Sequence, residues 1–505
     1  MRRETILSIL LLIAYTLAPE GLRAQRFEEV MGHNPWNASL NRAGLRCDTT
    51  EYSYAEVWGT LERGGLMNHS STDKGFDAGG RTESIRHFKR LSFAGNFAYD
   101  YFSGSEMWGS MFTTPGSWPV DLYEYTPGRK IRERYAFEGD LSADMGEHWR
   151  LGIGIDFMAG NYAKRKDLRH KNTTLDFEVI PAVQWHKGRW AVGAVYLFEK
   201  HTESVEAEEI GSTPDSYKAF LDKGLYYGVE QLWTSGDLHL DESGITSFPI
   251  QKNIHGAGLQ LQYGELFGEA AYRHTSGDTG EKGSVWHEFE GDRLSGLISW
   301  HHRTQKGARH ILRAEIDWQL LKNREVILTT TTEGGVTIPT VYGSVPILEQ
   351  RTLHTGLGYE WEQGGSHFEA GIAYTLRREQ SSLLYPRIMG QTLRQWHLFI
   401  RERYSWRPAE LTLGMHLRRG SHSEWEASES SLIPESPYPM QQSELFAWEN
   451  EYLTACRLGV ELAVRIYLGK GFYTDLSALW EHGFNLSVVP QPNRITSTLA
   501  FGYRW

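Results

Sequence analysis

Arginines recur at inward-type positions in three consecutive segments of the chain, where they are Arg377, Arg401, Arg403 and Arg418. A second run alternates with apolar residues and mixes both signs of charge: Arg313, Glu315 and Asp317. A planar guanidinium group binds carboxylates and phosphates in a bidentate manner. Facing rows of opposite charge also set the field inside an aqueous pore. We therefore expect a wall that attracts anions or carboxylates; an equally consistent interpretation is that these charges neutralise one another across a closed lumen.

Motifs of the common enzyme classes are missing. The sequence has no Gly-x-Ser-x-Gly, His-Glu-x-x-His, phosphate-binding glycine-rich loop or Cys-x-x-Cys. His301 and His302 are adjacent, and neighbouring side chains of a strand point to opposite faces, so the pair makes a poor chelate. A serine beside His397 or His416 is the remaining hydrolase alternative, and no motif supports it. We expect no enzyme activity, no metal and no cofactor.

The segments that carry the charges alternate with period two. Between residues 312 and 320, Leu, Ala, Ile, Trp and Leu alternate with Arg, Glu, Asp and Gln. A helix would need apolar residues at i, i+3 and i+4, which these segments do not show. Many of the segments are near the length of about 9–11 residues that a tilted membrane strand needs. The pattern predicts an all-β fold, a transmembrane antiparallel β-barrel.

The connections between these segments also alternate in length. Short turns, for example near 187–189 and 407–410, alternate with long polar connections such as 102–131, 202–253, 321–350 and 421–444. Short periplasmic turns and long extracellular loops are typical of outer-membrane barrels, whereas a soluble sandwich has no reason to sort its loops in this way. We count about 16 strands, with 14 to 18 compatible. They are expected near 85–101, 132–143, 148–160, 173–186, 189–201, 254–263, 265–275, 285–300, 309–320, 351–362, 366–378, 393–406, 410–420, 445–468, 472–484 and 494–505.

Large aromatic residues gather close to the short turns. An amphipathic indole is most stable at the boundary between hydrocarbon and headgroups, so a row of such residues predicts a membrane-interface girdle. If they filled a soluble core instead, they would lie in the middle of the strands. The residues of this row are Trp149, Trp185, Trp190, Trp300, Trp361, Trp406 and Phe472.

Composition narrows the class of protein further. The 505 residues are 13% aromatic and include only 2 Cys, which argues against disorder and against a disulfide-stapled secreted domain. The net charge of −11 offers no basic excess for binding nucleic acid. No stretch of 18 apolar residues is present, which argues against membrane-spanning helices.

The N-terminus predicts export. Arg2 and Arg3 precede a short apolar run and a cleavage site after Ala24, so residues 1–24 are expected to be a signal peptide. Residues 25–84 are expected to form a plug or periplasmic segment, with a strand pair from 51–62 onward as the alternative, and residues 85–505 the barrel. Cys47 and Cys456 could form a tether in an oxidising periplasm, but two isolated thiols are the favoured interpretation.

The sequence ends in alternating aromatics, with Phe501, Tyr503 and Trp505. This ending resembles the terminal-strand signal by which Gram-negative outer-membrane barrels are recognised for insertion. From Arg26 onward the layout is similar to a large uncharacterised outer-membrane β-barrel family of Bacteroidota. The resemblance implies an outer-membrane location, with outer-membrane lipid, lipopolysaccharide and the barrel-insertion machinery as partners, and no defined activity.

Two functions therefore remain open. The first is passage or uptake of a small hydrophilic solute through the lumen, because a barrel of about 16 strands encloses an aqueous space unless something fills it. The second is a closed barrel that serves as a surface scaffold, with loops 202–253 and 421–444 binding another envelope protein or a glycan. The sequence names neither the substrate nor the partner.

Overall fold

The computed structural model describes residues 32–166, 169–208, 217–234, 237–238, 247–281, 284–333, 336–382, 388–426 and 442–505. The expected signal peptide at 1–24, and residues 25–31 of the expected N-terminal segment, lie outside these ranges. Within them, no helix is long and apolar enough to cross a membrane.

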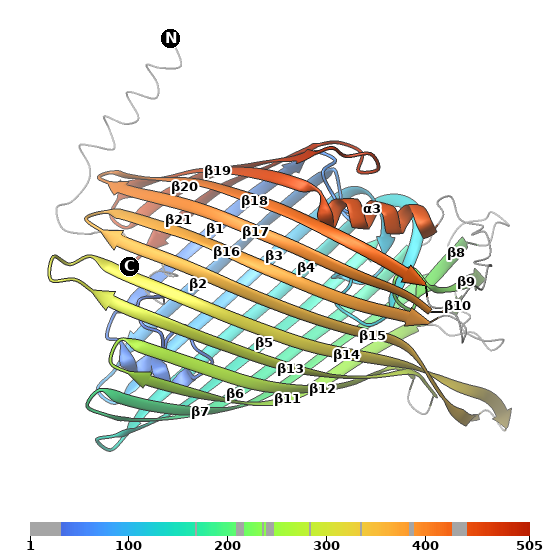
Figure 1. Cartoon of the computed structure of the whole chain (residues 1–505), viewed down its shortest axis with the longest axis horizontal. Coiled ribbons are helices and arrows are strands. Elements are labelled where there is room, and N and C mark those ends of the chain that lie inside the picture. The colour runs from blue at the N-terminus through green and yellow to red at the C-terminus, as the bar shows by residue number, and fades with distance from the viewer. Residues whose placement is uncertain are drawn as a thin grey trace, which may run out of the picture.

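Eighteen strands of the described chain close into one antiparallel barrel, to which β1–β7 contribute seven and β11–β21 contribute eleven. Neighbouring strands pair in sequence order, and β1 pairs with β21 to complete the ring (Figure 1). The ring strands are β1 (Tyr52–Arg63), β2 (Lys74–His87), β3 (Leu91–Ser110), β4 (Asp121–Met145), β5 (Trp149–Lys164), β6 (Arg169–Lys187), β7 (Trp190–Glu208), β11 (Ser247–Tyr263), β12 (Leu266–Glu281), β13 (Ser284–Arg303), β14 (Arg309–Glu333), β15 (Val336–Gln363), β16 (Ser366–Ser382), β17 (Ile388–Trp406), β18 (Ala409–Glu426), β19 (Cys456–Gly469), β20 (Phe472–Phe484) and β21 (Asn493–Arg504). The all-β barrel prediction is confirmed.

The remaining elements lie at the two ends of the ring. A short 3-10 helix, η1 (Arg42–Cys47), precedes β1, and helix α3 (Gln442–Thr454) precedes β19. Because β7 pairs directly with β11, the strands between them form an excursion: β8 (Tyr217–Asp222), β9 (Gly228–Thr234) and β10 (Asp237–Leu238). Strand β8 pairs with the first residues of β4. Figure 1 shows this excursion and α3 at one end, and the C-terminus at the other.

The strands are apolar on the outside and polar on the inside. In β11, Leu259 and Leu261 are 67% and 50% exposed, whereas Gln260 between them is 2% exposed. This is the reverse of a soluble protein, in which large apolar side chains are buried and exposed apolar patches are small. The outer surface is therefore a band of exposed leucine, isoleucine, valine and aromatic side chains, as a lipid environment requires.

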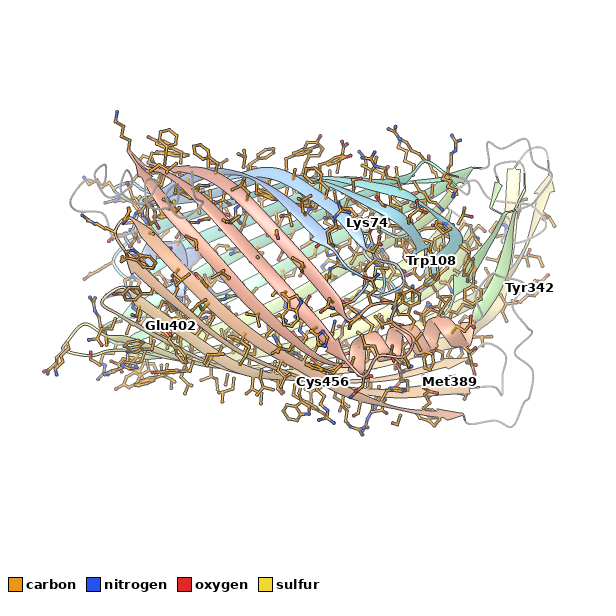
Figure 2. All side chains as sticks on the ribbon, turned by 90° about the horizontal axis from the view of Figure 1, so that it is seen from above. Lys74, Trp108, Tyr342, Met389, Glu402 and Cys456 are labelled. Atoms are coloured by element: carbon orange, nitrogen blue, oxygen red, sulfur yellow. The ribbon has the colours of Figure 1, made fainter. Side chains whose placement is uncertain are left out.

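The chain reverses by short turns at one end of the barrel and by longer connections at the other. Turns such as 188–189 and 364–365 contain two residues, whereas the β1–β2 and β20–β21 connections span 64–73 and 485–492. Figure 2 shows Glu402 near the short-turn end and Met389 toward the long-loop end, with Tyr342 beyond it on the β14–β15 hairpin. The predicted loop 321–350 is largely this hairpin, which extends the ring strands rather than leaving them.

The barrel begins at Tyr52 and not at residue 85, so the second part of the expected N-terminal segment 25–84 belongs to the barrel. Each of the sixteen expected strands has a counterpart in the structure. Strands β1 and β2 are the two additional ones. Strand β2 contains three glycines, Gly75, Gly79 and Gly80. Gly79 lies opposite Trp58 across the β1–β2 pair, where any Cβ would overlap the indole ring. Glycine here makes room for an aromatic neighbour, a known role of strand glycines.

The predicted strand 445–468 is wrong in its first half, which is helix α3. Leu445 and Trp448 are buried and Phe446 is partly buried, and spacings of three and four residues place side chains on one face of a helix. Strand β19 begins only at Cys456. The predicted strand therefore combined two successive elements, a helix and a strand.

Candidate functional site

Residues 32–50, here called the luminal segment, lie inside the barrel at its short-turn end. Asn41 caps η1, since its side-chain oxygen accepts a hydrogen bond from the backbone N–H of Ala43. Its amide nitrogen donates to Gln260 Oε1 in β11 and to the Val183 carbonyl in β6, each at 2.9 Å. Trp36 is 1% exposed and packs edge-on against Phe267 of β12. The luminal segment is thus a packed part of the barrel interior.

Inward-facing glycines form a shallow groove in the wall under this segment. A Cβ on Gly152 of β5 would overlap the backbone of Ala43, and one on Gly154 would lie 2.8 Å from Cγ of Arg42. A Cβ on Gly193 of β7 would overlap the side chain of Asn41. Glycine allows such close backbone approach at no steric cost, so the wall is built to receive the luminal segment.

The luminal segment also neutralises acidic side chains of the wall. Arg42 Nε lies 3.3 Å from Asp140 Oδ1, and its Nη2 lies 3.6 Å from Glu138 Oε1. Arg46 pairs with Asp144 through both Nε and Nη2. Asp144 also accepts from Arg150 of β5, which anchors the end of η1. Basic residues of η1 and acidic residues of the wall therefore hold the segment in place.

Both cysteines are free thiols. Cys47 ends η1 near the short-turn end and lies 3.0 Å from Arg150 Nη1, whereas Cys456 begins β19 next to helix α3. The favoured interpretation of two isolated thiols agrees with this placement, and burial raises the pKa of the Cys47 thiol.

The opposite mouth is closed by four pieces of chain, here called the cap: connection 64–73, loop 111–120, strands β8–β9 with their turn (217–234), and helix α3. Loop 111–120 is folded inward, and Glu203 of β7 holds it there. Glu203 Oε1 accepts from Thr113 N, Thr113 Oγ1 and Asn172 Nδ2 at 2.7–2.8 Å, and its Oε2 accepts from Trp118 Nε1 at 3.0 Å. One carboxylate, 4% exposed, thus receives four hydrogen bonds.

Apolar side chains join the cap to the barrel wall. Met111 and Leu122 are fully buried against Val205 of β7, Phe248 of β11 and Ala219 of β8. A second cluster packs Leu445 of α3 against Tyr123, Phe220 and Tyr226, and a third packs Trp448 against Leu66. Small apolar clusters of this kind are found beneath long loops, so the cap is a packed closure.

A chain of hydrogen bonds crosses the cap from connection 64–73 to α3. Ser70 Oγ lies 2.9 Å from His69 Nδ1, His69 Nε2 lies 2.7 Å from Tyr226 Oη, and Tyr226 donates to Glu449 Oε2 at 2.8 Å. Burial lowers the pKa of His69 to about 3, so the imidazole is neutral at ordinary pH. A neutral ring that donates through Nε2 and accepts at Nδ1 satisfies every bond in this chain.

A luminal cavity of about 560 Å³, larger than those of about 380 and 140 Å³, lies against β14–β19 in the short-turn half. Of the predicted charges, Arg313, Arg401 and Arg403 line it, together with Arg309 and four glutamates. Arg313 Nη1 lies 2.7 Å from Glu360 Oε1, and Arg401 Nη2 lies 2.9 Å from Glu461 Oε2. The cavity is therefore polar and close to balanced in charge, which agrees with mutually neutralised charges better than with an anion-attracting wall.

The other predicted luminal residues are spread along the same wall. Glu315 and Asp317 line a second cavity of about 380 Å³, where Asp317 accepts from Arg293 Nε at 2.8 Å. Arg377 lines a third cavity of about 140 Å³ under the cap. Arg418 pairs in register with Arg457 of β19 and lines none of these three cavities. The predicted cluster is thus divided among separate places.

The predicted girdle residues are mostly exposed near the short turns. Trp149, Trp190, Trp300, Trp406 and Phe472 are between 38% and 51% exposed. Trp185 is half-buried beside Trp149 on the neighbouring strand, and Trp361 is half-buried and borders the cavity of about 560 Å³. Phe501, Tyr503 and Trp505 of the terminal motif are exposed on β21 and after it.

Sequence reasoning missed the residues that close the barrel. Glu203 fell within the expected loop 202–253. It lies on the same strand face as Val205 and Ala207, and these positions continue the alternation of the preceding strand. Arg42 had no visible signal, because its acidic partners lie about a hundred residues away along the chain. Glycines at alternating inward positions, such as Gly152 and Gly154, were the one trace of the luminal segment.

Residues 43–504 match the family of unknown function DUF6850. The chain belongs to this family. No curated protein matches the sequence.

Solved outer-membrane receptors share the barrel fold at low similarity. They include the ferric-catecholate import receptor Fiu from E. coli K12 (TM-score 0.40, 6% identity, 89% of this chain and 81% of that chain). The ferric enterobactin receptor PfeA from Pseudomonas aeruginosa has a TM-score of 0.41 and 8% identity, over 91% of this chain and 81% of that chain. The siderophore receptor PirA from Acinetobacter baumannii has a TM-score of 0.41 and 7% identity over the same shares. The likeness concerns the fold alone.

Proposed function

We propose that the protein is an outer-membrane barrel that admits a small hydrophilic solute through a gated lumen. The observation that carries this proposal is a polar lumen with cavities of about 560 and 380 Å³ beneath a mouth closed by the protein's own cap. A barrel that served only as a scaffold would have no need of such spaces. The apolar outer band supports the membrane location.

The proposal includes export by the signal peptide expected at residues 1–24 and insertion by the barrel-assembly machinery of a Bacteroidota-type envelope. The exposed aromatic ending at Phe501, Tyr503 and Trp505 supports that route. The apolar band would contact outer-membrane lipid, and the loop end would contact lipopolysaccharide. The paired luminal charges argue against a strongly anionic solute, since Arg309, Arg313 and Arg401 in the cavity of about 560 Å³ each lie beside a glutamate.

A surface scaffold remains the second candidate, because the cap is well packed. Met111, Leu122 and Ala219 are each fully buried there. A closure of this kind could present a fixed surface to a partner protein or a glycan.

Conductance in planar bilayers tests the proposal. Glu206 of β7 pairs with Ser247 of β11, so residues 209–246 can be excised and the strands joined by a two-residue turn without changing the register. The matched control shortens the β14–β15 hairpin by removing 329–340, a paired end that belongs to no part of the cap. We expect a silent wild type, a silent control and an excised variant that conducts. A silent excised barrel that is still heat-modifiable would favour the scaffold.

A further inference from the structure

The third cavity, of about 140 Å³, lies where the cap meets the lumen wall. Connection 64–73, the infolded loop, the β8–β9 turn and α3 all contribute to it, and Gln350 and Arg377 form the wall side. On the inward face of β15 only Thr352 lies between Gln350 and His354, which lines the second luminal cavity. An occupant of this junction would therefore contact every part of the cap and lie directly above the lumen.

The junction holds more carboxylates than cations. Asp121, Asp222, Glu379 and Glu449 line it, against one arginine, Arg377. Arg377 Nε lies 3.7 Å from Glu379 Oε2, and Glu379 also accepts from Gln350, so this cation is engaged at one side of the cavity. Asp222 and Glu379 are each 9% exposed. Buried carboxylates without a counter-charge are costly.

One carboxylate oxygen of the junction has no hydrogen-bond partner. Asp121 is 6% exposed; its Oδ1 accepts from Ser110 Oγ and Leu122 N, but its Oδ2 is buried and unpaired. Burial raises the pKa of Asp121 to about 7, and burial raises the pKa of the adjacent Asp222 as well. The charged forms of these two neighbouring acids are therefore disfavoured by burial, and a cation beside them would offset that cost.

We propose that this junction binds a small organic cation, an ammonium or guanidinium group, with Asp121 and Asp222 as its carboxylate partners. The donor atoms do not form a metal cage, since no set of three or more His, Cys, Asp or Glu in the described part of the chain is arranged to hold a metal ion. Tyr123, Tyr226 and Trp118 line the same cavity and provide ring faces for a cation and for methylene groups. The cavity has room for several water molecules at about 30 Å³ each, which a short amine would displace. The inference rests on the proposed passage function and names the class of its solute.

Isothermal titration calorimetry of the mature protein in detergent, with agmatine as the cationic probe, tests this site. We expect saturable binding at pH 8, with proton release where buffers of different ionisation enthalpy are compared at pH 6.5. The titratable and charged groups that face Asp121 from the packed elements are Asp222, Glu203, Glu379, Glu449, Arg377, His69 and Lys130. Succinate, the anionic control, should not bind.

Asp121→Asn and Asp222→Asn should each weaken agmatine binding at least tenfold. The matched control is Glu288→Gln, the same loss of charge at an exposed position on β13. Asp121→Asn removes a buried carboxylate whose charged form is disfavoured by burial, so the cap should melt close to the wild-type temperature, and Asp222→Asn supplies the test if the first variant fails to fold. Agmatine affinity unchanged from the wild type in both variants, or binding of succinate as tight as that of agmatine, overturns the proposal.

The two proposals can fail separately. If agmatine does not bind but excision of 209–246 opens the barrel, the cation site is wrong and the passage function stands. If agmatine binds at Asp121 but the excised barrel is silent, the site stands and the passage function is wrong.

Discussion

Replacing Glu203 by glutamine should release the infolded loop. The amide oxygen can keep the donors of Thr113 and Asn172, but the amide NH₂ must then face the indole N–H of Trp118, so that bond is lost and a buried donor is left unpaired. Hydrogen bonds to a charged acceptor are about 1 kcal/mol stronger than neutral ones, and an unpaired buried donor costs about 1–3 kcal/mol. Easier burial of a neutral side chain offsets part of this loss. The net change is about 2–4 kcal/mol, or roughly 30- to 700-fold in the ratio of closed to open loop.

Hydrogen exchange of the peptide that covers the infolded loop measures this ratio, because exchange of buried amides follows the local opening free energy. The Thr113 amide, which donates to Glu203, should lose protection by about the same factor. Glu206→Gln is the matched control, since Glu206 lies three residues further along β7 and is exposed. Protection within threefold of the wild type, in a variant that still shows heat-modifiable mobility, would refute the argument that Glu203 holds the loop.

Three further predictions concern the luminal segment and the cap. Arg42→Met leaves the acids of the wall without their cation, so the luminal segment should become about 100-fold more open to a protease added from the short-turn side, consistent with about 3 kcal/mol for breaking a buried ion pair; unchanged cleavage would contradict it. Gly152→Ala should expel the same segment by overlap with its backbone, whereas Gly358→Ala, at a position with nothing within 4 Å, should not. The pKa of His69 is lowered to about 3, so its contribution to cap stability is lost as pH falls below 6.5; the pKa of Asp121 is raised to about 7, so its contribution is present below 3.8 and is lost as pH rises through 7. The melting temperature of the cap, followed between pH 4 and 8, should therefore fall with rising pH in His69→Gln. It should rise with pH in the double variant Asp121→Asn, Asp222→Asn, because burial also raises the pKa of Asp222; equal slopes in the two proteins would contradict these assignments.

The positions of the strands could be predicted because a barrel wall between lipid and lumen imposes period two on every strand that crosses it. The same rule identified the inward charges. It could not say which of them meet, because that depends on the stagger of neighbouring strands. Arg313 and Glu315 are two residues apart and face inward, yet they line different cavities. Arg377 lines the cavity beneath the cap, and the pieces of the cap have no local sequence pattern that predicts where they lie.

The segments outside the wall were the hardest to predict, because their partners are distant in sequence. Helix α3 was merged with the strand that follows it. The contacts that bury α3 join it to Leu66, Tyr123 and Tyr226, which lie far away along the chain.

The pairing of β1 with β21 makes the barrel a ring with one seam, and that seam sets the order in which the protein can be made. Thr60 and Thr498 share a hydrogen bond across it at 2.9 Å, although 438 residues separate them along the chain. The edge of β1 therefore has no correct partner until β21 has been synthesised, and an unpaired strand edge is a template for aggregation. Long-range pairing of this kind also slows folding. We therefore expect the newly made chain to depend on a factor that shields the edge of β1 until the chain reaches the membrane. Pairing with β21 would end this dependence.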